Sequence, residues 1–357
     1  MITPGGVARR RPARAAVHGR RAAGHSLQHG WFTRRAAGKR EDMRFGYKLM
    51  AEAFDPKELI RQAVRAEEAG FDFVEISDHY HPWLEEQGHS PFAWNVLSAI
   101  AARTERLGLA TGVTCPTVRY HPAIIAQAAA TLAIISDGRF TLGIGSGERL
   151  NEHVVGQGFP SVRVRQEMLA EALDIINLLW QGGYQSYQGR YLQLEDARVF
   201  DLPETLPVIA VAAGGRHAAE LAATHGSGLF ATEPRRDLVD AYTGKGGSGP
   251  KYAEIPMAWA PTVEAAAQEA HRTSRWSLTG WKVMSELPNP VNFAAAAETV
   301  RVADVREKFV CGPDPQPYLD AARTYAEAGF DHLVLQNAGP DPDGFLEFFS
   351  RELKPRW

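Results

Sequence analysis

From about residue 44 onward, short apolar segments alternate with longer segments of mixed polarity. Most apolar segments are nearly continuous in hydrophobic residues, which is typical of strands buried on both faces, and the segments after them have helical periodicity. The expected strands are 44–49, 73–76, 107–113, 139–143, 208–211, 229–231, 255–260 and 332–336. The expected helices are 56–69, 92–103, 122–135, 162–180, 216–224, 317–328 and 345–353.

This alternation favours a parallel sheet that closes into a barrel. About eight strand–helix units over about 310 residues match a (β/α)8 TIM barrel with insertions. A doubly wound open sheet is the alternative, but it predicts a dinucleotide fingerprint after the first strand, and residues 49–53 contain none. The rhythm breaks at 184–200, where residues 187–191 indicate an inserted hairpin, and it is weakest over 232–310.

The composition is ordinary for a folded globular protein. Of the 357 residues, 45% are hydrophobic and 23% are charged, which allows a sizeable core. No apolar run reaches the roughly 18 residues that span a bilayer, so we expect no membrane helix. The only cysteines, Cys115 and Cys311, lie far apart in the sequence, which suits the reducing cytoplasm and provides no metal-ligand spacing.

The formal net charge of −3 combines two unlike parts. Residues 1–40 contain ten Lys and Arg and no Asp or Glu, so residues 41–357 contain 29 basic and 42 acidic side chains, a net charge of −13. An acidic body makes nucleic-acid binding through a basic surface unexpected.

Arginine pairs also begin twin-arginine export signals, but the sequence after Arg21 is too polar for a signal peptide. We expect 1–42 to be a disordered or non-native leader and 43–357 to form one barrel domain.

Polar, titratable and aromatic side chains follow the first five expected strands. Because the carboxyl ends of barrel strands meet at one rim, we expect these side chains to lie together. Each one alone has a structural explanation, such as a helix cap or a tight turn, but five such strand ends together favour a catalytic rim. The residues concerned are Glu52; Asp78, His79 and Trp83; Cys115; Ser146, Gly147, Glu148 and Asn151; and Gly214 and Gly215.

Five segments, in this order, resemble the luciferase-like monooxygenase superfamily and, within it, the deazaflavin-dependent glucose-6-phosphate dehydrogenase family. They are 46–52, 77–83, 116–122, 145–152 and 212–215. The resemblance extends from about residue 43 to the C-terminus and is weakest over 232–310. It implies a TIM barrel that binds coenzyme F420, an 8-hydroxy-5-deazaflavin, and moves a hydride between a substrate carbon and C5 of F420. The superfamily often dimerises, so a homodimer is expected too.

The resemblance also implies a set of cofactor-binding residues. A bulge at Gly112 and Val113, with a non-proline cis peptide bond, would support the deazaflavin ring from behind, and Cys115 stands near the cofactor in place of a threonine. The remaining contacts to the deazaflavin and its tail would come from Asp78, Ser146, Gly147 and Asn151. The tail phosphate would be held by Gly214, Gly215, His217 and Ala218.

The same resemblance implies the roles of four residues in the chemistry. His79 would face the hydroxyl group being oxidised and take its proton, since the histidine pKa lies near neutrality. Glu148 would exchange a proton with a nitrogen of the deazaflavin ring. Trp83 would steady the reacting species, and Glu52 would line the pocket. The sequence leaves open whether His79 or Glu148 is the base that acts on the substrate.

The substrate is expected to be a sugar phosphate such as glucose 6-phosphate, with a different alcohol or carbonyl substrate as the alternative. The family binds the phosphate with a threonine and several cations from later loops. Thr232 matches the threonine, Arg235 stands where the family has lysine, and Lys282 and Lys308 correspond to the other cations. Arginine and lysine are not equivalent ligands for phosphate, so this departure bears on the choice of substrate.

There are two rival functions, and the second belongs to a different class. One is an FMN-dependent monooxygenase of the same superfamily. A deazaflavin dehydrogenase is favoured over it by residues at two strand ends: Asp78, His79 and Trp83, and Gly147, Glu148 and Asn151. The other is a non-catalytic protein that uses the basic leader to bind nucleic acid or an anionic surface. That second rival requires the catalytic rim to be idle.

Overall fold

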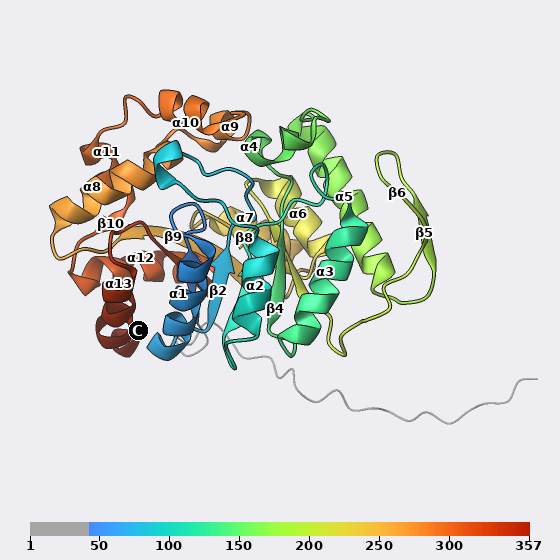
Figure 1. Cartoon of the computed structure of the whole chain (residues 1–357), viewed down its shortest axis with the longest axis horizontal. Helices are drawn as coiled ribbons and strands as arrows, with labels where there is room; N and C mark the ends of the chain where they lie inside the picture. Colours follow the sequence, from blue (N-terminus) through green and yellow to red (C-terminus); the bar gives the residue numbers. More distant parts are fainter. Residues whose placement is uncertain (1–42) are drawn as a thin grey trace, which may run out of the picture. The chain divides into compact units, whose positions relative to one another are not determined.

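The computed structural model describes residues 43–357, and the expected leader at 1–42 lies outside this part of the chain. Eight parallel strands pair in the order β1, β2, β3, β4, β7, β8, β9 and β11, and β11 pairs with β1 to close the ring. Figure 1 shows helices packed around this sheet. The (β/α)8 TIM barrel expected from the sequence is therefore confirmed.

The barrel strands agree closely with the expected segments. The clearest difference is at 255–260, where the strand begins at Lys251 because Lys251 and Tyr252 pair with Leu229 and Phe230 of the preceding strand. The barrel strands are β1 (Arg44–Leu49), β2 (Phe73–Ile76), β3 (Gly108–Thr111), β4 (Phe140–Ile144), β7 (Val208–Ala212), β8 (Gly228–Ala231), β9 (Lys251–Ala258) and β11 (His332–Asn337). The strands outside the ring are β5 (Gln185–Gln188), β6 (Gln193–Ala197) and β10 (Val310–Cys311).

Local sequence signals explain where the helices begin and end. The Asp55 side chain accepts hydrogen bonds from the backbone N–H groups of Lys57 and Glu58, Pro56 occupies the first turn, and Gly70 ends the helix at φ 89°. The helices before the hairpin are α1 (Pro56–Ala69), α2 (Ala93–Ala101), α3 (Pro122–Ile135), α4 (Arg149–Glu152) and α5 (Val162–Leu179). Those after it are α6 (Arg216–His225), α7 (Arg236–Gly244), α8 (Val263–Ser274), α9 (Trp281–Met284), α10 (Pro290–Ala296), α11 (Val302–Lys308), α12 (Pro315–Ala328) and α13 (Pro342–Phe348).

The inserted hairpin expected at 184–200 is present as the antiparallel pair β5 and β6. It projects beside α5 in Figure 1. The final expected helix is divided, since α13 ends at Phe348 and a π-helical turn continues over Phe349–Leu353. The hairpin adds no strand to the barrel, so the ring of eight strands is unaffected.

Side chains alternate between the inside and the outside of the barrel, as strand geometry requires. Tyr47 and Leu49 of β1 pack with the outer hydrophobic core, while Lys48 between them points inward toward Glu75 and Glu254. Toward the amino-terminal ends of the strands the interior is apolar, with Phe73, Phe230, Tyr252, Ala210 and Val334 in one cluster. The interior therefore changes from aromatic to charged along the barrel axis.

The segment with the weakest sequence pattern covers part of the carboxyl end of the barrel. The backbone N–H of Arg149 on α4 donates to the carbonyl of Ser285, just after α9, at 2.9 Å. Figure 1 shows α9 and α10 on the same side of the molecule as α4. None of the helices in residues 43–357 combines the length and the apolar character that crossing a membrane requires.

Candidate active site

Three side chains from three loops meet at the carboxyl end of the barrel. Nδ1 of His79, after β2, lies 2.6 Å from Oε1 of Glu52, after β1. Nε2 of His79 lies 3.5 Å from Oε1 of Glu148, after β4. The side chains are only 10%, 3% and 14% exposed for His79, Glu52 and Glu148. The structure therefore brings together the three titratable residues that were expected to carry the chemistry.

The charges of this trio depend on one another. Burial alone would lower the pKa of His79, but the adjacent Glu52 carboxylate and the nearby Glu148 outweigh burial, so the pKa of His79 is raised. Burial would raise the pKa of Glu52, but contact with His79 outweighs that effect and the pKa of Glu52 is lowered. His79 is therefore a stronger base than an isolated histidine, and Glu52 remains a carboxylate.

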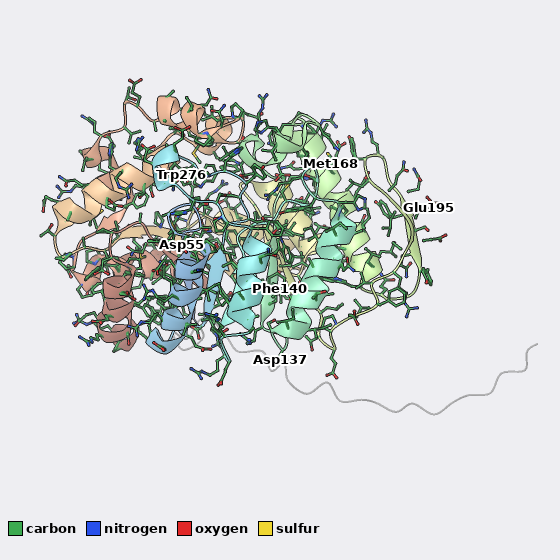
Figure 2. All side chains as sticks on the ribbon, viewed as in Figure 1. Asp55, Asp137, Phe140, Met168, Glu195 and Trp276 are labelled. Atoms are coloured by element: carbon green, nitrogen blue, oxygen red, sulfur yellow. The ribbon has the colours of Figure 1, made fainter. Side chains whose placement is uncertain are left out.

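An aromatic stack forms one wall beside His79. The indole of Trp83 meets the His79 ring edge to face, with ring centroids 4.8 Å apart. On its other side Trp83 stacks on Trp276, with centroids 4.0 Å apart and an angle of 12° between the rings. Figure 2 labels Trp276, which lies in the 3₁₀ turn between α8 and α9. Sequence analysis missed Trp276 because nothing in the pattern of 232–310 points to it.

Asn151 ties two of the catalytic loops together. Its Oδ1 accepts hydrogen bonds from the backbone N–H groups of Tyr80 and His81, at 2.7 and 3.1 Å. Its Nδ2 donates to Oε1 of Glu148 at 2.5 Å. This buried amide therefore fixes the loop after β2 relative to the Glu148 carboxylate. The expected contact between Asn151 and the deazaflavin stays a prediction.

Asp78 is buried beneath the rim, and protein donors surround its carboxylate. Because these donors hold both oxygens, Asp78 orders the loops after β2 and β3, and its contact with a cofactor stays a prediction. The donors are Thr114 Oγ1 at 2.8 Å, Trp94 Nε1 at 3.2 Å, Tyr120 Oη at 3.2 Å and the Arg119 guanidinium at 3.2 Å.

Arg119 extends this network to a second buried acid. Its backbone N–H donates to Oε2 of Glu152 at 2.9 Å. Burial raises the pKa of Glu152 to about 7, although the Arg119 contacts oppose the rise. Arg119 and Glu152 had been assigned no role from the sequence, although both lie within segments that carry the family resemblance.

The segment expected to support the deazaflavin ring from behind has the expected cis peptide bond, and the loop with Gly147 packs beside it. The peptide bond between Gly112 and Val113 is cis. Gly147 has a φ of 76°, and a Cβ at this position would lie 2.6 Å from Sγ of buried Cys115. A side chain at 147 is therefore excluded both by the backbone conformation and by contact with the β3 loop. Ser146, next to Gly147, is half-buried.

The start of α6 fits an anionic group such as a cofactor phosphate. Gly215 precedes the helix and provides no side-chain cap, so the first N–H groups of α6 are available. A Cβ built on Gly214 or Gly215 would meet nothing within 4 Å. In the first turn, His217 is exposed and Ala218 is buried. These residues leave open space and free donors where the resemblance places the phosphate.

The four expected phosphate ligands differ in their surroundings. Thr232 follows β8 and is exposed, and nearby Arg235 donates from Nη1 to the Gly214 carbonyl at 3.1 Å. Nη2 of Arg235 also lies 2.5 Å from Oδ2 of Asp237. Lys282 on α9 and Lys308 at the end of α11 are exposed, and their side chains form no hydrogen bond or ion pair within residues 43–357. The structure thus brings Arg235 to the α6 start, but it joins neither lysine to that group.

A charged cluster inside the barrel was also missed. Nζ of Lys48 lies 2.6 Å from Oε1 of Glu75 and 2.5 Å from Oε1 of Glu254. All three are charged residues between apolar neighbours on buried strands, and this unusual placement is the signal that could have identified them. The described residues include no group of three or more His, Cys, Asp or Glu suited to a metal ion.

Comparison with known proteins places these features among relatives. Residues 43–332 match the model of the luciferase-like monooxygenase family. The F420-dependent glucose-6-phosphate dehydrogenase of Microbacterium testaceum is 35% identical over 327 residues, 88% of this chain and 97% of the relative. The enzyme of the same name from Kineococcus radiotolerans is 38% identical over 331 residues, with coverage of 88% and 97%. An F420-dependent secondary alcohol dehydrogenase, solved with an F420-acetone adduct, superimposes with a TM-score of 0.82 at 27% identity, covering 88% of this chain and 98% of that one.

Proposed function

Because the chain belongs to the luciferase-like monooxygenase family, and within it to the F420-dependent glucose-6-phosphate dehydrogenases, we propose that it is an F420-dependent dehydrogenase acting on an alcohol group. Glucose 6-phosphate is the leading substrate. The observation that carries the proposal is the arrangement of Glu52, His79 and Glu148, in which one nitrogen of a buried histidine is paired and the other faces a second carboxylate. When bound, F420 supplies a carbon, C5, that exchanges a hydride with the substrate.

His79 accepts the proton of the substrate hydroxyl group in the oxidation direction. Glu52 lies next to Nδ1, so it favours the tautomer with the proton on Nδ1 and a lone pair on Nε2. It also stabilises the imidazolium ion that forms when Nε2 takes the proton. In the reduction direction His79 returns this proton. The raised pKa of His79 suits a group that must bind a proton during turnover.

The Glu148 carboxylate provides a second group that can bind a proton, 3.5 Å from Nε2 of His79. The Asn151 amide fixes its Oε1 at 2.5 Å, so the carboxylate has a defined orientation without any substrate. We assign to Glu148 the proton exchange with the deazaflavin nitrogen and to His79 the exchange with the substrate. The edge-to-face contact with Trp83 restricts the orientation of the His79 ring.

The cofactor would be held by groups at three strand ends. The loop at Gly112 and Val113 would support the ring, and the loop with Ser146 and Gly147 would border it. The tail phosphate would lie at the start of α6, where Gly214 and Gly215 leave free N–H groups and open space. In a body with a net charge of −13, this local group of donors is needed to attract an anionic cofactor.

The substrate phosphate would be bound by Thr232, Arg235, Lys282 and Lys308. Support comes from the contact of Arg235 with the Gly214 carbonyl and from the unpaired state of the two lysines within the described part of the chain. The second candidate is a dehydrogenase of an uncharged alcohol. It is favoured by the ion pair between Arg235 and Asp237, which neutralises much of the charge that a phosphate would use.

The proposal is tested by mixing the full-length protein with F420 and glucose 6-phosphate and following loss of the visible absorbance of oxidised F420. Glucose and a simple secondary alcohol serve as matched substrates without phosphate. Reduction with glucose 6-phosphate alone supports the leading substrate, and reduction with the secondary alcohol alone supports the second candidate. Tight FMN binding with oxygen-dependent turnover, and no reduction of F420, would overturn the proposal in favour of a monooxygenase.

We also propose that the enzyme works in the cytoplasm as a homodimer. Both cysteines are free thiols, as expected in a reducing compartment. Ile124, Ile134 and Ile135 on α3 are large apolar side chains that are at least 43% exposed, and a second copy of the chain would cover them. Light scattering on the purified protein distinguishes a dimer from a monomer, and Ile124→Glu should shift a dimer toward monomer.

A further inference from the structure

A second close pair, Lys48 and Glu75, lies below the pair formed by Glu52 and His79, on the same two strands. Lys48 of β1 and Glu75 of β2 are opposite each other in the parallel register. Glu52 and His79 each follow four residues later, just beyond the strand ends. The lower pair is joined at 2.6 Å and the upper pair at 2.6 Å. On β1 the Lys48 cation precedes the Glu52 carboxylate, and on β2 the Glu75 carboxyl group precedes His79.

Lys48 is held rigidly in this lower layer. Its ammonium group has three N–H donors. They reach Oε1 of Glu75 at 2.6 Å, Oε1 of Glu254 on β9 at 2.5 Å and the carbonyl of Gly112 at 3.2 Å. The Lys48 side chain is 4% exposed, so water cannot replace any of these contacts. A fixed positive charge therefore lies inside the barrel beneath the catalytic trio.

The two carboxyl groups that contact Lys48 differ in how readily they ionise. Burial raises the pKa of Glu75 well above its ordinary value, and Glu254 adds to the rise. Burial also opposes ionisation of Glu254, but the Lys48 cation outweighs it and the pKa of Glu254 is lowered. One carboxylate and one neutral acid thus face Lys48, as is expected for two acids at one site.

The effect of Lys48 extends to the upper layer. Burial raises the pKa of Glu52 and contact with His79 lowers it. The Lys48 cation also acts to lower the pKa of Glu52. It acts in the same direction on the pKa of His79, where it opposes the effects of Glu52 and Glu148. The charged groups that face the upper pair are therefore Glu148 from the loop after β4, Lys48 from β1 and Glu254 from β9.

We propose that Lys48 is a positioning residue for proton transfer, whose fixed charge limits how tightly His79 holds its proton. This rests on the proposed function only in that His79 is the proton acceptor. A buried cluster of this kind can also serve stability alone. The two roles differ, because a structural role changes unfolding without changing the titration of His79.

The test is an NMR titration of the His79 ring in the full-length protein without cofactor or substrate. The His79 signal is assigned by its absence in His79→Ala. Lys48→Met removes a cation that acts to lower the pKa of His79, so we expect the His79 midpoint to rise by more than about 0.3 pH unit. Lys48→Gln, which keeps a polar group, is the second variant, and circular dichroism establishes that each variant is folded.

Glu75→Gln and Glu254→Gln are the matched controls. In either variant the remaining carboxyl group carries the negative charge, so Lys48 stays charged and the His79 midpoint should change by less than about 0.3 pH unit. An unchanged or lower midpoint in both folded Lys48 variants overturns the proposal, as do equal shifts in all four variants. Because no turnover is measured, this result is independent of whether glucose 6-phosphate is the substrate.

Discussion

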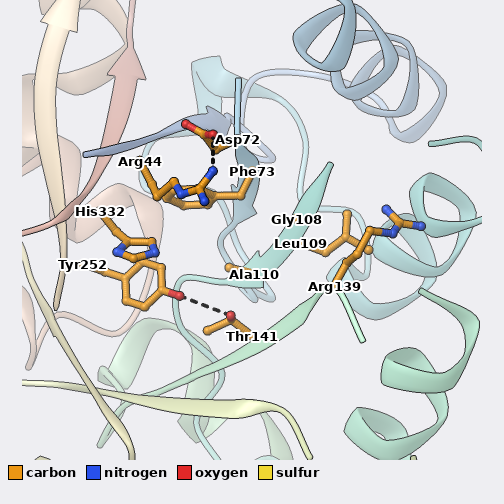
Figure 3. Close-up of a pocket in the computed structure, with 10 residues that line it drawn as sticks. All are labelled: Arg44, Asp72, Phe73, Gly108, Leu109, Ala110, Arg139, Thr141, Tyr252 and His332. Carbon is orange, nitrogen blue, oxygen red and sulfur yellow. Dashed lines mark hydrogen bonds and ion pairs between the residues drawn. The ribbon is translucent and has the colours of Figure 1, made fainter. Parts of the chain in front are cut away.

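The barrel has a histidine–carboxylate pair at each end, and the two pairs are almost equally close. At the carboxyl end, Nδ1 of His79 lies 2.6 Å from Glu52, and at the amino-terminal end Nδ1 of His332 lies 2.7 Å from Asp331. His332 of the second pair borders a cavity of about 170 Å³ formed by the first residues of the strands (Figure 3). Distance alone therefore does not distinguish the reactive pair from the other.

Burial and the group at the second nitrogen distinguish them. His79 and Glu52 are 10% and 3% exposed, and Glu148 faces the second nitrogen. His332 and Asp331 are 24% and 36% exposed, and Asp331 is shared with the ammonium of Lys251 at 2.7 Å. The ring of His332 packs against Tyr252, with centroids 4.5 Å apart. Of these two pairs, His79 and Glu52 are the more deeply buried. Glu52 is not shared with a lysine as Asp331 is, and the second nitrogen of His79 faces Glu148.

The largest expected effect comes from removing each histidine in turn. His79→Ala should lower kcat by about 10²–10⁴-fold, because the general base is lost. His332→Ala should leave kcat close to that of the parent protein. Steady-state assays of F420 reduction measure both variants. Similar losses in the two variants would show that the comparison between the barrel ends has no functional meaning.

Replacement of Glu148 tests which group is the substrate base. Glu148→Gln keeps the oxygen that accepts from Asn151 but removes the charge, and we expect kcat to fall by about 10²-fold. If His79 is the substrate base, kcat/KM of Glu148→Gln still falls at low pH, because His79 becomes protonated there; this fall is the acidic limb of the pH profile. Disappearance of that limb would assign the substrate proton to Glu148 instead.

Replacement of Glu52 should have a smaller effect with a defined sign. The Glu52 carboxylate raises the pKa of His79, and the neutral base is the active form in oxidation. Glu52→Gln should therefore move the acidic limb of kcat/KM to lower pH and reduce kcat by about tenfold, since a weaker base accepts the proton less readily. Asp331→Asn is the matched change at the other end and should leave the limb in place. A shift to higher pH in Glu52→Gln would contradict the assignment.

The smallest effect is expected at the mouth of the amino-terminal cavity. Arg44 pairs with Asp72 at 2.9 Å, but its side chain is 61% exposed, so water and salt screen the interaction. Arg44→Ala should lower the free energy of unfolding by at most about 1 kcal/mol, measured in urea, and should not alter kinetics. A loss of activity in this variant would give the amino-terminal end a role that the comparison denies it.

Much of the fold could be read from the sequence because its signals are local. The Asp55, Pro56 and Gly70 signals delimit α1 where expected, and the apolar segments mark the barrel strands. The prediction was weakest over 232–310, where short helices such as α9 and α10 lack a long periodic pattern. Those helices are positioned by contacts such as the one between Arg149 and Ser285, which no local pattern encodes.

The same division applies to the site. The sequence by itself determined that Glu52, His79 and Glu148 follow strands of one parallel barrel, and the topology then requires them to share a rim. Only the tertiary structure decided which nitrogen of His79 faces which carboxylate, that Trp276 stacks on Trp83, and that Lys48 contacts both Glu75 and Glu254. These relations join residues on different strands or far apart in the chain, and they depend on side-chain directions and burial that are fixed only when the barrel closes.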